Sequence, residues 1–424
     1  MSTYFAGKAV RLMYTEKEVI TFVKDNDVKF IRLAFCDLLG NQKNISILPD
    51  ALETAFERGI PFDGSSILGF NDVVNSDLFL FPDASTLSIL PWRPQQGRVV
   101  RFFCNIKNSD GTDFLCDSRK ILEKVIARSM KSGIGCKVGS ECEFYLFKTD
   151  DDGNRTDIPY DRGGYCDVSP LDKGENVRRE VCLTLEEMGI TPESSHHEHG
   201  PGQNEIDFEC SNPLRSADNL ITFKSVVAVV ANRSGLSASF EPKPIPGESG
   251  NALHINLSLY KNGKNIFDIE GSNDNARISR AFMAGVINRI KEITVFLNPS
   301  KSSYERFGNF GAPKFISWSS QNRSQLIRIP AATGEKKRME LRSPDPLANP
   351  YLAYALVLSA GLEGIEKNME PMEAVNINLY NENPEVNLDR LPLSLEEAKG
   401  YAKESEFVRG VLGDTVTEKF IEII

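Results

Sequence analysis

At residues 139–147 the chain reads Gly-Ser-Glu-Cys-Glu-Phe-Tyr-Leu-Phe, so polar and apolar side chains alternate along it. Successive side chains of a β-strand point to opposite faces. Glu141 and Glu143 therefore share one face of a predicted strand, and Cys142 and Phe144 share the other. The pattern predicts a sheet that has one apolar face and one face bearing carboxylates.

Three other segments show the same alternation. Their polar faces carry Glu205 and Asp207 in residues 203–208, His254, Asn256 and Ser258 in residues 252–259, and Arg338, Glu340 and Arg342 in residues 338–342. Alternation usually means that one face of a sheet meets water. These faces, however, hold acids, a histidine and arginines without lysine. Two unpaired carboxylates ~4 Å apart repel by ~4 kcal/mol at an effective dielectric of ~20. A metal site is therefore as good an interpretation as a solvated face.

The histidines favour the metal interpretation. The chain has only 4 of them. His196, His197 and His199 precede Glu205, and His254 lies in one of the alternating segments, so all of them lie beside acid-bearing strands. Because the surrounding ligands are mostly carboxylates, the pattern favours Mg²⁺ or Mn²⁺. A zinc site in the His-His-Glu-His run is the second interpretation.

Four arginines suggest how phosphate could be bound. The sequence contains neither a Gly-x-Gly-x-x-Gly fingerprint nor a P-loop lysine motif, so phosphates would need metals and arginines. Arg323, Arg328, Arg338 and Arg342 lie near Glu340 in the sequence. A guanidinium binds phosphate or carboxylate through two parallel hydrogen bonds. Surface ion pairing is the commoner role of arginine, but the two arginines that flank Glu340 on one strand face favour a site.

Length and composition limit the alternatives. A chain of 424 residues with 41% hydrophobic and 25% charged residues predicts a globular protein of two or three domains. The net charge of -10 argues against binding to nucleic acid or anionic membranes. We find no secretory signal and no apolar segment long enough to span a membrane. The 8 cysteines form no Cys-x-x-Cys pair, which favours a reducing, cytoplasmic location.

Turn residues divide the chain into two predicted domains. The run Asn-Ser-Asp-Gly at 108–111 indicates a boundary between residues 1–108 and residues 109–424. The hydrophobic periodicity predicts a helix at 15–27 and strands at 28–35, 44–48 and 98–106 in the first part. In the second part it predicts helices at 118–132, 175–189, 217–235, 275–297, 349–368 and 394–403, with the alternating strands between them.

Six motifs together resemble the type I glutamine synthetases, in their short alpha-like form. They are Phe62-Asp-Gly-Ser-Ser-Ile-Leu-Gly-Phe70, Ser140-Glu-Cys-Glu-Phe144, His196-His-Glu with Gly202-Gln-Asn-Glu205, Lys243-Pro with Leu253-His254, Gln321-Asn-Arg323 with Arg328-Ile-Pro, and Arg338-Met-Glu-Leu-Arg342 with Asn349-Pro-Tyr-Leu352. They follow the family's order and cover nearly the whole chain. The resemblance implies an α+β fold: a small N-terminal β-grasp domain and a large C-terminal catalytic α/β domain with an antiparallel-strand funnel.

The resemblance also implies an activity and a set of site residues. The activity is ATP-dependent ligation of the glutamate γ-carboxylate to ammonia or a small amine, by way of an acyl phosphate. Two to three Mg²⁺ or Mn²⁺ ions would be bound, one by Glu141, His254 and Glu340 and a second by Glu143, Glu198 and Glu205. Arg323, Arg328, Arg338 and Ser258 would contact ATP, and Ser249, Gly250, Arg306 and Arg342 would bind glutamate. Asp63, Ser66, Tyr165 and Glu198 would surround the amine, with Asp63, Glu198, Arg323 and Arg342 as the catalytic residues.

The family assembles in rings, so the resemblance implies a homo-hexamer or dodecamer with active sites between subunits. Asp63 would then come from the neighbouring subunit. A non-catalytic relative with an assembly or regulatory role is the alternative. It is the weaker one, because such a protein has no reason to keep mutually repelling carboxylates.

The sequence departs from the family pattern at the catalytic flap. The family reads Gly-Tyr-Glu-Ala-Pro, whereas residues 308–313 read Gly-Asn-Phe-Gly-Ala-Pro, so Gly311 stands where a glutamate is expected. Ser249 likewise replaces an asparagine expected to bind glutamate. Loss of the flap carboxylate removes a base and opens space, which predicts a preference for an alkylamine. Ammonia remains an alternative, because the other amine-site residues are kept. Tyr380 aligns with a tyrosine that some relatives adenylylate, but the residues after it differ, and we expect no such control.

Overall fold

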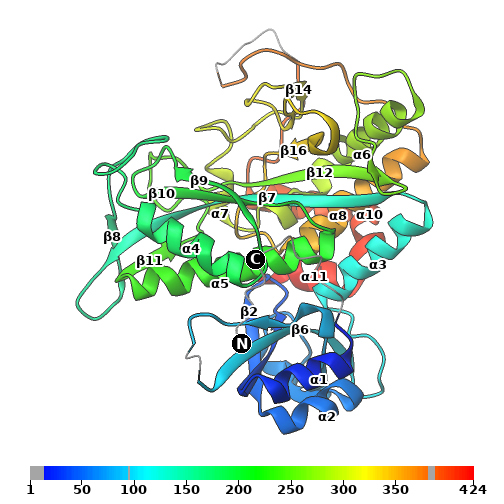
Figure 1. Cartoon of the computed structure of the whole chain (residues 1–424). Coiled ribbons are helices and arrows are strands. Elements are labelled where there is room, and N and C mark those ends of the chain that lie inside the picture. Colours follow the sequence, from blue (N-terminus) through cyan, green and yellow to red (C-terminus); the bar gives the residue numbers. More distant parts are fainter. Residues whose placement is uncertain (1–13, 94–95, 381–386) are drawn as a thin grey trace.

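The computed structural model describes residues 14–93, 96–380 and 387–424. An N-terminal sheet of 6 strands has the order β2-β1-β6-β4-β3, with β5 paired to β6. The strands are β1 (Val28–Cys36), β2 (Gln42–Ile47), β3 (Ile60–Asp63), β4 (Asp77–Pro82), β5 (Ser88–Ile89) and β6 (Arg98–Asn108). The central pair β1–β6 is parallel. Helices α1 (Glu16–Asp25) and α2 (Leu52–Arg58) cover the side of this sheet that faces away from the rest of the chain (Figure 1).

A second sheet of 10 strands follows, in the order β14-β15-β16-β12-β7-β10-β9, with β8 and β11 paired to β7 and β13 paired to β12. Its strands are β7 (Gly135–Thr149), β8 (Arg155–Pro159), β9 (Pro192–His197), β10 (Gln203–Phe208), β11 (Leu236–Ser239), β12 (Leu253–Lys261), β13 (Lys264–Asn265), β14 (Trp318–Ser320), β15 (Ile327–Ile329) and β16 (Met339–Leu341). Apart from the parallel pair β14–β15, neighbouring strands are antiparallel.

Helices pack against the large sheet, some directly and others by way of neighbouring helices. They are α3 (Ser118–Lys131), α4 (Glu175–Glu187), α5 (Pro213–Arg233), α6 (Asp274–Leu297), α7 (Lys301–Tyr304), α8 (Pro350–Glu366), α9 (Leu395–Glu404), α10 (Glu406–Leu412) and α11 (Asp414–Ile423). Those in direct contact include α3, α4 and α5. Phe144 of β7 packs against Phe223 of α5, with ring centroids 6.0 Å apart. The hydroxyls of Ser140 on β7 and Tyr354 on α8 are hydrogen-bonded. The predicted α+β class, with its small N-terminal domain and antiparallel catalytic sheet, is confirmed.

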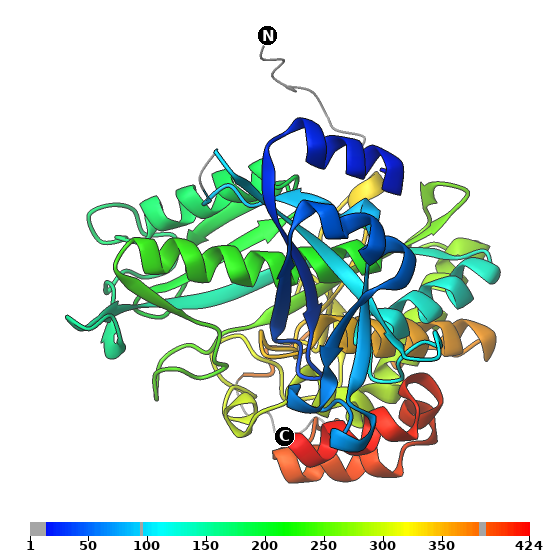
Figure 2. The same ribbon diagram turned by 90° about the horizontal axis from the view of Figure 1, so that it is seen from below.

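The two sheets are linked by buried contacts. Asn349 caps α8 through its side-chain oxygen, and its amide nitrogen donates to the Leu38 carbonyl in the small domain. Lys419 on α11 donates to the carbonyl of Phe70. Figure 2 shows the C-terminal helices, in red, lying beside the small domain, in blue. The loop after β3 is therefore held by the body of the catalytic domain.

Helix boundaries agree with the predictions except at α5 and at the C-terminus. Helix α5 begins at Pro213 rather than at residue 217, because the Asn212 side chain accepts the Arg215 amide and proline is tolerated in the first turn. Helices α2, α7, α10 and α11, all of 10 residues or fewer, were not predicted. Strand β6 ends at Asn108, the first residue of the predicted turn. Among the described residues, no helix combines the length and the apolar character that crossing a membrane requires.

Candidate active site

The polar faces predicted from sequence alternation meet on the large sheet. Its register pairs Asp207 on β10 with Glu141 on β7, and Glu141 with His254 on β12. Two residues away on each of these strands, Glu205 of β10 is paired with Glu143 of β7. Directly paired residues of antiparallel strands project from the same face. The separate predicted faces therefore form one continuous surface.

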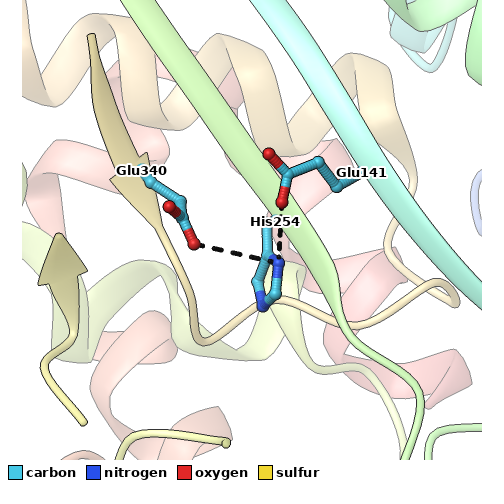
Figure 3. A group of neighbouring side chains, drawn as sticks. All are labelled: Glu141, His254 and Glu340. Carbon is cyan, nitrogen blue, oxygen red and sulfur yellow. Dashed lines mark hydrogen bonds and ion pairs between the residues drawn. The ribbon is translucent and has the colours of Figure 1, made fainter. Parts of the chain in front are cut away.

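Glu141, His254 and Glu340 converge, as Figure 3 shows. The Nδ1 atom of His254 lies 3.2 Å from Glu141 Oε2 and 3.9 Å from Glu340 Oε1. One ligand atom from each residue lies within 4.8 Å of the other two. Burial raises the pKa of the Glu141 carboxyl, but the hydrogen bond and the charge of His254 outweigh it, and the pKa is lowered to about 2. Glu141 is therefore ionised at neutral pH, as a metal ligand must be.

Glu340 is also the partner of two of the predicted arginines. Arg328 Nη1 lies 2.6 Å from Glu340 Oε2, and Arg342 Nη1 contacts Oε1. Arg342 further donates through Nε to the Arg323 carbonyl at 3.1 Å. Arg338 donates through Nε to Asn256 at 2.9 Å. The guanidinium groups thus line the edge of the carboxylate cluster, where a phosphate chain would need them.

A second cluster surrounds Glu198, which follows β9. His196 Nε2 lies 2.9 Å from one Glu198 oxygen, and His199 Nδ1 lies 2.8 Å from the other. His196, Glu198 and Glu205 offer ligand atoms that lie within 4.8 Å of one another. His197 points elsewhere and meets Asp161. The three histidines of the run therefore diverge, which does not fit a zinc site built from all of them.

Glu143 lies on the same sheet face as Glu205, and donors from the chain already bind its carboxylate. Its carboxylate accepts the Ala252 amide at 2.8 Å and the Gln203 side-chain amide at 3.0 Å. Burial and then the charge of Glu198 raise the pKa of Glu143 to about 7. Burial and then the charges of Asp207 and Glu143 raise the pKa of Glu205 well above its usual range.

These raised pKa values show crowded carboxylates that lack compensating charge. A divalent cation would relieve the repulsion. The donor set consists of carboxylate oxygens with a few imidazoles, which suits Mg²⁺ or Mn²⁺. The residues present therefore fit the divalent metal that the sequence predicts.

Two cavities open onto this surface. The Glu198 cavity, of about 730 Å³, is lined by Glu141, Glu143, Tyr165, Glu198, Glu205, Gly250, His254, Arg306, Arg323, Arg328, Arg338 and Arg342, among others. The Ser258 cavity, of about 750 Å³, is lined by Ser258, Asn256, Tyr260 and Lys336, among others. Glu141, Asp207 and Arg338 line both. The two cavities therefore meet at the carboxylate cluster.

The flap residues line the Glu198 cavity. Gly311 has a φ of +90°, and Phe310, a bulky residue, has a φ of +45°. The Phe310 ring lies 4.8 Å from Lys243 Nζ and is 59% exposed. A Cβ atom added at Gly311 would meet only Arg342 Nη2, at 4.0 Å. The position where a flap glutamate was expected is therefore open space.

Asp63 and Ser66 line neither cavity of the single chain. They lie in the small domain, where Asp63 accepts hydrogen bonds from Ser65 and Ser66. Ser249 is buried, and its carbonyl accepts the Tyr145 hydroxyl at 2.5 Å. The sequence predicts that Asp63 acts in a neighbouring subunit, and its place outside the chain's own cavities is compatible with that prediction.

Three neighbours of the site were not assigned a role from the sequence. Asn256 bonds both Glu141, at 2.8 Å, and Arg338. Its place between His254 and Ser258 on one strand face was a usable signal. Gln203 holds Glu143, and Phe310 lines the cavity. No sequence pattern points to Phe310, because its role follows from an unusual backbone conformation.

Comparison with known families agrees with the resemblance. The family described as "Glutamine synthetase, beta-Grasp domain" matches residues 27–109, and "Glutamine synthetase, catalytic domain" matches residues 115–423. A glutamine synthetase of Clostridium saccharobutylicum is 45% identical over 414 residues, which cover 96% of this chain and 94% of the relative. One of Methanosarcina mazei is also 45% identical, over 413 residues, 96% of this chain and 92% of the relative.

Solved structures with a similar fold include another glutamine synthetase. A GmaS/ADP complex superposes with a TM-score of 0.87 at 31% identity, over 95% of this chain and 94% of that one. Plasmodium falciparum glutamine synthetase gives a TM-score of 0.85 at 24% identity, over 98% of this chain and 96% of that one. The second likeness concerns the fold alone.

Proposed function

This chain belongs to the glutamine synthetase family, and on that premise we propose that it prefers a primary alkylamine to ammonia as its nucleophile. It is a glutamine synthetase-like, ATP-dependent ligase that joins glutamate to ammonia or an amine. The family uses ATP and a divalent metal. The proposal concerns the choice of amine, together with the roles of individual residues.

The chemistry needs activation of the acid before the amine can attack. The terminal phosphoryl group of ATP is transferred to the glutamate γ-carboxylate, which gives an acyl phosphate and ADP. The amine nitrogen then attacks the acyl carbon, the bond to phosphate breaks, and phosphate leaves. The attacking nitrogen loses a proton in this step, so a base beside it accelerates the reaction.

The chain's own residues support these steps. Divalent cations held by Glu141, His254 and Glu340, and by Glu143, Glu198 and Glu205, would neutralise charge on the transferring phosphoryl group. Arg323, Arg328 and Arg338 would bind phosphate oxygens, with Ser258 in the second cavity near the nucleotide. Arg306 and Arg342, both buried, would bind the carboxylates of glutamate, with Ser249 and Gly250 beside them.

Gly311 is the observation that carries the choice of amine. It lines the same cavity as Tyr165 and Glu198, and no carboxylate occupies its place. Ammonium would therefore lack one of the expected bases, and water could enter the open space and hydrolyse the acyl phosphate. An alkyl group would fill that space. Phe310 and Tyr165, both exposed within the cavity, offer apolar faces to it, and aromatic faces also attract an alkylammonium ion.

Assembly would complete the amine site. Members of the family form oligomers with active sites between subunits. We infer that Asp63 and Ser66 of one subunit of a homo-hexamer or dodecamer reach the Glu198 cavity of the next.

All eight cysteines, which include Cys36 and Cys166, are free thiols, which fits a reducing cytoplasm.

The test is phosphate release in the presence of glutamate, Mg-ATP and a panel of amines, from ammonia through methylamine to longer alkylamines. We expect a higher kcat/KM for at least one alkylamine than for ammonia. Without any amine, we expect measurable release from hydrolysis of the acyl phosphate. Efficient turnover of ammonia together with rejection of every alkylamine would refute the proposal and leave glutamine synthesis, the activity named for the relatives at 45% identity.

A further inference from the structure

The histidine run contains one member that the proposed chemistry does not use. His196 and His199 face Glu198, whereas the His197 side chain is 0% exposed and points away from the cavity. We propose that His197 is a positioning residue that fixes residues 161–172, the Tyr165 loop, against Glu198 and thereby sets the affinity for the amine. This inference rests on the proposed amine-site roles of Tyr165 and Glu198.

His197 joins the strand side and the loop side of the amine site. Its Nδ1 atom lies 2.6 Å from the Glu198 carbonyl oxygen, and its Nε2 atom lies 2.8 Å from Asp161 Oδ1. A carbonyl oxygen can only accept a hydrogen bond, so Nδ1 donates there. The His197 carbonyl in turn accepts the Cys166 amide at 2.9 Å. One residue thus bonds the backbone of Glu198 and both the beginning and the middle of the Tyr165 loop.

The loop packs closely on the imidazole ring. A Cβ atom added at Gly163 would lie 3.0 Å from His197 Nε2, closer than ordinary packing allows. Tyr165, two residues further on, stacks on His199 with ring centroids 4.6 Å apart and meets His196 edge-on at 5.4 Å. Since those two histidines hold the carboxylate oxygens of Glu198, the position of the loop determines how Tyr165 and Glu198 face each other.

A bound cation is the competing explanation for this cluster, because Asp161, Asp172 and His197 could hold one. The hydrogen bonds argue against it. Asp161 already accepts the amides of Gly202 and Lys173, at 2.9 and 2.8 Å, besides His197. Asp172 makes two hydrogen bonds to Arg178. Each carboxylate is therefore satisfied by donors from the chain, as a structural anchor requires.

The ion pair between Asp172 and Arg178 anchors the other end of the Tyr165 loop. Arg178 on α4 bonds Asp172 and also donates to the Asn204 side chain on β10 at 2.6 Å. Both ends of the Tyr165 loop are therefore tied to the β9–β10 hairpin through buried side chains. Small displacements of a positioned group are costly in catalysis, so releasing one anchor should weaken amine binding before it affects the distant nucleotide.

Two substitutions separate the two bonds of His197. In His197→Asn the amide nitrogen can take the place of Nδ1 and keep the Glu198 carbonyl bond, but it cannot reach Asp161. In His197→Gln the amide can take the place of Nε2 and keep the Asp161 bond. We expect His197→Asn to raise the KM for the amine about tenfold, equivalent to ~1.4 kcal/mol, with the KM values for ATP and glutamate changed less than about twofold. His197→Gln is the matched control and should change the amine KM less.

A structural readout accompanies the kinetics. The Cys166 amide should exchange its hydrogen faster in His197→Asn than in the wild type, while helix α3 (Ser118–Lys131) should be unchanged. Equal changes in all three KM values, or unchanged exchange at Cys166, would overturn the inference. If His197→Asn does not fold, Asp161→Asn removes the same anchor from the loop side and is judged by the same measurements.

The kinetics use whichever amine the wild type turns over best, ammonia included. A wild type that prefers ammonia would therefore refute the proposed function and leave this inference intact. Suppose instead that the wild type prefers alkylamines but His197→Asn changes the KM for the amine no more than the KM values for ATP and glutamate. That result would refute this inference and leave the proposed function intact.

Discussion

Replacing Gly311 by glutamate is expected to move the preference of the enzyme from alkylamines towards ammonia. The new carboxylate would occupy the open space in the flap and restore a base beside the attacking nitrogen. It would also exclude the alkyl group and keep water from the acyl phosphate. The expected result is a higher kcat/KM for ammonia and a lower one for the alkylamine.

The structure sets the size of two opposing effects. Gly311 has a φ of +90°, which costs an L-residue roughly 1–2 kcal/mol, or about tenfold in the population of the active flap. Space is not limiting, because an added Cβ has only Arg342 Nη2 within 4.0 Å. A positioned general base contributes ~10²–10⁴-fold. The gain exceeds the cost, so kcat/KM for ammonia should rise by about 10- to 1,000-fold.

Two control variants isolate the carboxylate. Gly311→Ala carries the backbone cost alone, and Gly311→Gln adds the same bulk without the charge. Phosphate release and amide formation are measured for each variant with ammonia and with the best alkylamine. The KM for glutamate is followed as well, because a new carboxylate near Arg342 competes for that guanidinium. If Gly311→Glu and Gly311→Gln give the same ratio of ammonia to alkylamine efficiency, the flap base has no part in choosing the amine.

Three further predictions concern the metals, the subunit interface and the Asp161 anchor. Glu340→Ala should abolish ATP turnover and reduce the rise in melting temperature expected when Mg²⁺ is added, with the remainder coming from the second proposed metal site; near-normal phosphate release would contradict the metal assignment. Asp63→Ala and Glu340→Ala should each be inactive, but subunits mixed and reassembled should recover about a quarter of wild-type activity, since sites between subunits then combine two intact halves; no recovery would place Asp63 and Glu340 in the same site of one chain. Burial raises the pKa of Asp161, but the hydrogen bonds from His197 and from the Lys173 and Gly163 amides, together with the charge of His197, outweigh it and lower the pKa to about 2 from 3.8, so its stabilisation is present above pH 3.8 and lost as pH falls through 2. Asp161→Asn should therefore lower the free energy of unfolding in urea at pH 7, with a smaller difference from the wild type near pH 3; a constant difference would exclude the charge as its origin.

Local alternation was sufficient to place the acids on one sheet face. Period-2 patterning needs only neighbouring residues, so Glu141 with Glu143 and Glu205 with Asp207 were assigned to common faces from the sequence. The pairing of Glu141 with His254 depends on strand register between segments far apart in the chain. Alternation alone does not fix that register, and it was the resemblance to a family that supplied the grouping.

Neither the alternation of residues nor the family resemblance predicted how the side chains around Glu198 are arranged. His196, which the predicted ligand set did not include, offers a ligand atom beside Glu198 and Glu205, whereas the Glu143 carboxylate in the same cavity already accepts hydrogen bonds from Gln203 and the Ala252 amide. That outcome depends on competition among hydrogen-bond donors in three dimensions. The role of His197 was equally hidden, since a run of three histidines does not reveal which ring points into the protein.

The meeting of the two cavities at Glu141, Asp207 and Arg338 has a kinetic consequence. Apart from these three residues, the Ser258 cavity and the Glu198 cavity have separate walls, so only the phosphate end of the nucleotide, at Arg323 and Arg328, would reach into the cavity proposed for the amine. If the two reactants enter through these separate cavities, neither has to pass the other's binding place, and we expect a bound nucleotide not to obstruct exchange of the amine. Initial-rate plots against amine concentration at several fixed ATP concentrations should then intersect to the left of the ordinate, and the amide product should depart without waiting for ADP.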